Sequence, residues 1–141
     1  MLYVLKIIHI FAVVFGAGSG ITNGILASRI IKNPDAGPPP PMVVGLMQTM
    51  GKIGPIAMIL LWLSGLGLVY AEFGSLDIGA LFYLKLAGAT LALVCVMLMA
   101  RMAMQAQVAG TPPPLKTMKK ISHLVWLGVL TAVTCAVVLF N

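Results

Sequence analysis

Two ionisable residues stand inside otherwise apolar stretches of this sequence, namely His9 and Lys85. An imidazole nitrogen is a common ligand for metals and for haem iron, whereas a lysine would have to bind iron as the neutral amine. Ionisable side chains within a membrane are rare, and each is a functional-site hypothesis by default. His9 and Lys85 are therefore the candidate catalytic and metal-ligating residues.

Small residues accompany His9 along one face of its predicted helix. At about 100° per residue, the residues on the side of His9 are Val13, Gly16, Gly20, Asn23 and Ala27. A strip with so little side-chain bulk could accept a flat macrocycle. Glycines at four-residue spacing also let two membrane helices approach closely. The strip alone leaves both interpretations open.

Lys85 stands on a similar face of its own helix. Its neighbours on that face are Leu81, Gly88, Ala89, Ala92 and Val96. The two faces predict a flat slot between the first and third spans, at the depth of His9 and Lys85. Haem b would fit it with His9 as axial ligand, Gly16 and Gly20 along its plane, and its propionates towards Lys6. The alternative for Lys85 is a lysine that snorkels to the nearer interface.

The elements that carry these residues are long and apolar. Of the 141 residues, 60% are hydrophobic and 9% are charged, whereas a soluble domain has about 25% charged residues. A span of the bilayer needs roughly 20 helical residues. The sequence predicts an all-α integral membrane protein, a single domain (1–141) of four transmembrane helices at about 2–31, 43–71, 78–107 and 117–140.

Proline and glycine mark the breaks between these spans. The proline-rich stretch 33–41 predicts an extended, non-helical connector, because proline lacks the amide donor. Pro55, with glycines on its N-terminal side, predicts a kink or a restart within the second span. A short loop at 72–77 carries Glu72 and Asp77. No basic segment precedes the first apolar run, so it is expected to be a span and not a cleaved signal.

Basic residues set the predicted orientation. They lie near the first and third connections: Arg29, Lys32, Lys52, Arg101, Lys116, Lys119 and Lys120. The positive-inside rule then makes both termini non-cytoplasmic and the chain a multi-pass protein of the cell (inner) membrane. His123 would enter from the cytoplasmic side, at a different depth from His9. The net charge of +6 is spread over span ends and does not indicate nucleic-acid binding.

Four segments carry a resemblance to a known family. They are LKIIHI at 5–10 with Arg29 after the same span, GPIAMI at 54–59, GLGL at 65–68, and YLKL at 83–86. Over about the first 105 residues the chain resembles the HemJ-type protoporphyrinogen oxidases and the related CopD-like small membrane proteins. The resemblance implies haem b, with His9 and Lys85 as the functional pair and Arg29 beside the cofactor. The entry to the last span, 116–120, departs from the family, and His123 has no counterpart in it.

These observations favour a b-type haem protein with a redox role, either electron transfer or oxidation of a quinol or porphyrinogen. The alternative is transport of copper or another metal ion, because thioethers suit Cu(I) and four methionines cluster in the third span, at Met97, Met99, Met102 and Met104. A structural or accessory membrane protein is the third interpretation. The expected partners are the lipid bilayer, a quinone or porphyrin substrate and, since four helices are few for enclosing a macrocycle, further copies of the chain.

Overall fold

The computed structural model describes residues 2–74 and 79–140, and most of them are helical. Its four long helices are α1 (Leu2–Lys32), α2 (Pro41–Phe73), α3 (Ala80–Val108) and α4 (Leu115–Phe140). All four are long and apolar enough to cross a membrane. The prediction of an all-helical chain with four membrane-length helices is confirmed. Asp77 and the first predicted residue of the third span, Ile78, lie outside the described residues.

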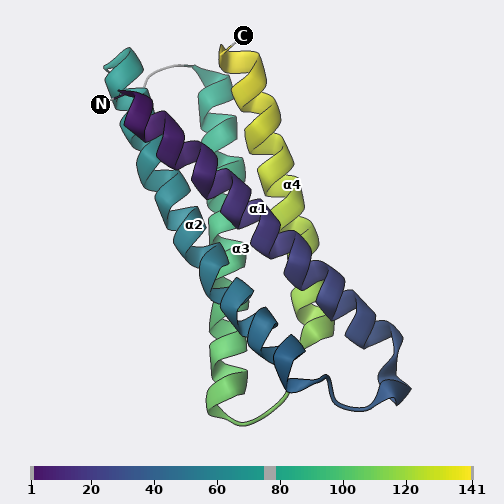
Figure 1. Cartoon of the computed structure of the whole chain (residues 1–141). Helices are drawn as coiled ribbons and strands as arrows, with labels where there is room; N and C mark the ends of the chain where they lie inside the picture. Colours follow the sequence, from purple (N-terminus) through teal and green to yellow (C-terminus); the bar gives the residue numbers. More distant parts are fainter. Residues whose placement is uncertain (1, 75–78, 141) are drawn as a thin grey trace.

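The helices run alternately up and down and form two antiparallel hairpins. α1 packs mainly on α2 and α3 mainly on α4, with smaller contacts between α2 and α3 and between α1 and α4. The start of α1 and the end of α4 lie at one end of the bundle, and the α1–α2 and α3–α4 connections lie at the other (Figure 1). α1 and α3 therefore belong to different hairpins and are not a main packing pair.

The seam between α1 and α2 is lined largely by small residues. Each of five residue pairs across the seam contains a glycine, and a methyl group built on that glycine would lie within 4 Å of a side-chain atom of the other residue. The pairs are Leu5 with Gly67, His9 with Gly65, Gly16 with Ala57, Ser19 with Gly54, and Asn23 with Gly51. The α1 members follow one another at steps of three, four or seven residues, which is the spacing of a single helix face. The register is constant along the seam, so each level of α1 has a defined partner on α2.

The seam between α3 and α4 brings two backbones into direct contact. A methyl group at Gly88 would lie 2.7 Å from the carbonyl oxygen of Gly128, and one at Gly128 would lie 2.6 Å from that of Gly88. Ala92, beside this crossing, is fully buried. Membrane helices associate through such close packing of small residues, because lipid is as apolar as the helix surface. Gly88 and Gly128 therefore fix how closely α3 and α4 approach.

Proline interrupts the helices less than expected. α2 is unbroken from Pro41 to Phe73 with Pro55 inside it, so the helix does not restart there, and the kink at Pro55 stays a prediction. Membrane helices tolerate proline because neighbouring helices and local adjustments satisfy the freed backbone groups. The first connection is also more helical than predicted. Residues Pro34–Ala36 form a 3-10 turn, and Pro41 is the first residue of α2, where a missing amide donor costs nothing.

Candidate functional site

The imidazole of His9 lies against α2, in the second turn of α1. Its Nδ1 atom is 3.0 Å from the hydroxyl oxygen of Ser64. A methyl group at Gly65 would lie 3.3 Å from Cε1 of the ring and 3.7 Å from Nδ1. The absence of a side chain at Gly65 therefore leaves room for the ring, and Ser64 holds one of its edges.

The hydrogen bonds of Ser64 determine which ring nitrogen of His9 carries the proton. The Ser64 hydroxyl oxygen lies 2.6 Å from the carbonyl oxygen of Leu60 and 3.2 Å from that of Leu61. Carbonyl oxygens only accept, so the single Ser64 proton is directed to them. The Ser64 oxygen can then only accept from His9, which places the proton on Nδ1 and the lone pair of the neutral ring on Nε2. Metal-bound histidines are held in this way, with the second nitrogen donating to a fixed acceptor.

Lys85 lies in the second turn of α3. The contact between α2 and α3 sets the level of Lys85. A methyl group at Gly54 of α2 would lie 3.9 Å from Val96 of α3. Because the two helices are antiparallel, moving eleven residues from this pair, forward along α2 and backward along α3, leads to Gly65 and Lys85. Lys85 is therefore level with the glycine on which His9 rests, and both side chains are half-buried.

The small residues near His9 and Lys85 were predicted to line a flat slot between the first and third spans, but in the structure they have a different role. Gly16 faces Ala57 of α2, and Gly88 faces α4. A methyl group at Gly20 would meet nothing within 4 Å, so this glycine lies on an open face of α1. Small residues allow the closest backbone approach between helices, and here that approach occurs within each hairpin instead of between α1 and α3.

Two of the other predicted cofactor-binding residues lie apart from this pair or have a protein partner. Lys6 Nζ is 3.1 Å from a carboxylate oxygen of Glu72, so its charge is directed towards the last turn of α2. Arg29 stands twenty residues along α1 from His9, a rise of about 30 Å. The structure thus places His9 and Lys85 at one level of the bundle and Arg29 at its opposite end.

His123 is remote from His9, as its place in the sequence predicts. It stands eight residues after the start of α4, at the end of the bundle that holds the α3–α4 connection. Its Nδ1–H donates to the carbonyl oxygen of Lys119 at 2.8 Å, and its side chain is exposed. A helix-surface histidine bonded to its own helix has no part in the arrangement around His9.

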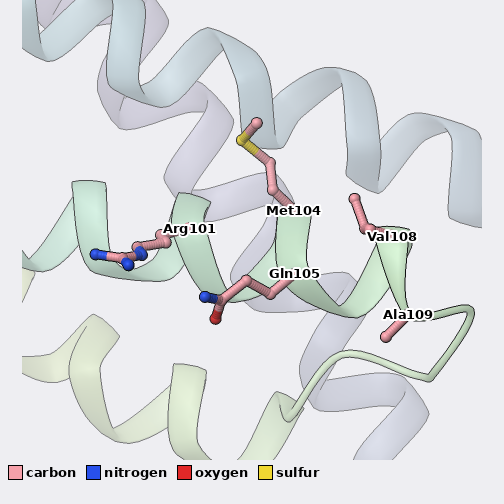
Figure 2. A pocket seen from close by; sticks show the side chains of 5 residues that line it. All are labelled: Arg101, Met104, Gln105, Val108 and Ala109. Atoms are coloured by element: carbon pink, nitrogen blue, oxygen red, sulfur yellow. The ribbon is translucent and has the colours of Figure 1, made fainter.

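The methionines of α3 do not converge. At about 100° per residue, Met97 and Met104 share one face of the helix, while Met99 and Met102 point elsewhere. Met104 is exposed on a hollow near the end of α3 (Figure 2). No group of three or more His, Cys, Asp or Glu among the described residues could hold a metal ion, and Cys95 and Cys135 are buried free thiols.

This donor set distinguishes between two kinds of metal centre. A bare ion needs several protein ligands, and the described residues contain no group of three or more His, Cys, Asp or Glu that could hold one. A porphyrin brings its own four nitrogens and needs only an axial ligand from the protein. A single imidazole such as His9 meets the protein's side of the second requirement and not of the first.

Ser64 and Gly65 are the site residues that sequence reasoning missed. Gly65 belongs to the GLGL segment noted above, but neither residue had been given a role. The sequence contained a signal for Ser64. This polar residue of an apolar helix stands about as far from the end of α2 as His9 stands from the start of α1. An antiparallel hairpin brings two such positions to the same level.

Comparison with known proteins finds no matching family model, no similar curated protein and no similar solved structure. A functional assignment therefore rests on the geometry around His9.

Proposed function

We propose that this chain is an integral membrane protein that binds haem b through Nε2 of His9 and has a redox role. One observation carries the proposal: Nδ1 of His9 lies 3.0 Å from the hydroxyl oxygen of Ser64, which itself lies 2.6 Å from the carbonyl oxygen of Leu60. Since the Ser64 proton goes to that carbonyl oxygen, Nδ1 of His9 donates and the lone pair is on Nε2. Fixing the ring and its tautomer in this way is typical of an axial ligand. The donor set supports it, since haem needs just one imidazole from this region.

Haem supplies one-electron redox chemistry when bound, and the protein supplies binding, orientation and electrostatics. His9 would hold the haem through Nε2, Ser64 orients the His9 ring, and Gly65 makes room for that ring. Lys85, at the level of His9, could donate a hydrogen bond to a substrate or, after losing its proton, act as a second ligand. The substrate class that suits this site is a quinol or a porphyrinogen, each of which can give up electrons from within the bilayer.

The distribution of charge supports one orientation in the membrane. The end of the bundle with the α1–α2 and α3–α4 connections, called here the basic end, carries Arg29, Lys32, Arg101, Lys116, Lys119 and Lys120. At the other end Lys6 is paired with Glu72, so it counts little against this bias. By the positive-inside rule the basic end is cytoplasmic. Both termini and the His9 site then lie on the non-cytoplasmic side of the cell membrane.

The visible absorption spectrum of the purified protein tests the proposal. We expect a Soret band and, after reduction with dithionite, sharp α and β bands of a b-type haem. The haem content per chain should be measured after expression with added haem precursor, so that supply does not limit loading. A protein that stays colourless under these conditions, although folded and helical, would contradict the proposal.

A further inference from the structure

The basic end carries six cations that make no ion pair with a described residue. They are Arg29, Lys32, Arg101, Lys116, Lys119 and Lys120. The acidic residue in the described part of this end is Asp35, which is exposed. The cations therefore attract anions from outside the chain.

One of these cations, Arg101, borders a hollow on α3. The hollow has a volume of about 390 Å³ and is lined by Arg101, Met104, Gln105, Val108 and Ala109. Figure 2 shows the guanidinium of Arg101 extended along α3 away from Val108, and so away from the end of the helix. A guanidinium that does not snorkel towards the helix end needs a counter-charge at its own depth.

The surface on the membrane side of Arg101 is apolar and exposed. Leu98, Val94 and Leu91 follow Arg101 back along one face of α3, at steps of three or four residues, and they are 47%, 50% and 43% exposed. An anionic group at Arg101 would therefore have an apolar stripe beneath it that leads towards the bilayer centre. A charged head above an apolar chain is the chemistry of a phospholipid.

We propose that this face of α3 binds one anionic phospholipid. Its phosphate lies on Arg101, Gln105 donates to a further oxygen, and an acyl chain follows Leu98, Val94 and Leu91. Arginine suits the phosphate because its planar fork can donate two parallel hydrogen bonds. Lys119 of α4 adds charge at this level. Gly88 of α3 lies beside Ala132 of α4, and because the two helices are antiparallel, Arg101 of α3 is then level with Lys119 of α4. The lipid site does not depend on the haem proposal.

Native mass spectrometry of the detergent-purified protein tests this site. Phosphatidylglycerol and phosphatidylcholine with the same acyl chains are offered at equal concentration. We expect the protein to retain phosphatidylglycerol preferentially and Arg101→Gln to weaken that retention about fivefold, the effect of about one cation near an anionic lipid. Arg101→Lys, which keeps the charge and loses the fork, should give an intermediate loss.

Lys32→Gln is the matched control, because it removes one positive charge from the basic end but on α1. It should leave the retention of phosphatidylglycerol unchanged. Equal losses in Lys32→Gln and Arg101→Gln would overturn the site in favour of general surface charge. Equal retention of the two lipids by the wild-type protein would overturn it as well, and displacement of the lipid by an equal concentration of inorganic phosphate would reassign the hollow to a free anion.

Discussion

The Nδ1 atom of His9 lies 3.0 Å from the hydroxyl oxygen of Ser64, across the seam between α1 and α2. This hydrogen bond joins α1 and α2 at the level of Lys85, and it directs the Nε2 lone pair of His9 away from Ser64. It fixes the orientation of the His9 ring within an apolar helix. The functional proposal depends on this orientation, so the first prediction concerns Ser64.

Replacing Ser64 by alanine should weaken haem binding about 10- to 100-fold, the usual effect of removing the residue that orients a metal ligand. It should also destabilise the protein by about 1–3 kcal/mol, because the half-buried Nδ1–H loses its acceptor. Haem titration and thermal unfolding measure the two effects. Ser19→Ala is the control, since Ser19 is buried in the same seam but bonds only to the carbonyl oxygen of Gly16 in its own helix. Equal effects of the two substitutions would contradict a specific role for Ser64.

A methyl group at Gly65 should disturb His9 without unfolding the bundle. In Gly65→Ala the new methyl would lie 3.3 Å from Cε1 of the ring, so the imidazole must move by a few tenths of an ångström. We expect a shifted Soret band or a lower haem content at a normal helical content by circular dichroism. Gly24→Ala, where an added methyl group meets nothing within 4 Å, should leave the spectrum unchanged. A wild-type spectrum in Gly65→Ala would show that the ring position has no influence on the cofactor.

Gly88 should be much less tolerant of alanine than a glycine on an open face. Its methyl group would lie 2.7 Å from the backbone oxygen of Gly128, so α3 and α4 must separate. Overpacking of this kind costs about 1–3 kcal/mol, and it should appear as a lower unfolding temperature in detergent. Gly18→Ala has nothing within 4 Å to clash with and should keep the wild-type temperature. Similar unfolding temperatures for the two variants would contradict the close crossing of α3 and α4.

The proposed orientation predicts which positions react with a membrane-impermeant maleimide on intact cells. The exposed residues Ala71, near the end of α2, and Thr111, in the α3–α4 connection, can be replaced singly by cysteine in a chain whose Cys95 and Cys135 are alanine. We expect Ala71→Cys to be labelled and Thr111→Cys to be labelled only after the cells are opened. The reverse pattern would place the basic end outside and the His9 site inside.

Much of the fold could be predicted from the sequence, because the four helices follow from apolar length and from the proline and glycine breaks between them. The helix partners could not, since a face of small residues allows close approach but does not name the neighbour. Gly16 and Gly88 were expected to line one slot and in fact lie in two different seams. Tracing helix packing needs the register of each hairpin, which the positions of single residues do not give.

Within the candidate site, His9 and Lys85 could be identified because ionisable groups in apolar helices are conspicuous. Ser64 was missed because a serine is common in membrane helices, and its position signals a role only once α1 and α2 are paired as an antiparallel hairpin. The protein partner of Lys6 was missed for a related reason. Glu72 was assigned to a loop, but α2 continues to Phe73 and presents Glu72 to Lys6, which therefore has a protein partner without any cofactor.

The most direct test compares the reduced-minus-oxidised absorption spectra of the wild-type protein, His9→Ala and His123→Ala, purified in the same way. His9 is held by Ser64 at the level of Lys85, whereas His123 is exposed and bonds to Lys119 of its own helix. We predict that the wild-type protein and His123→Ala show the bands of a b-type haem and that His9→Ala loses them or becomes five-coordinate. Loss of the haem from His123→Ala with retention in His9→Ala would contradict this account of the site.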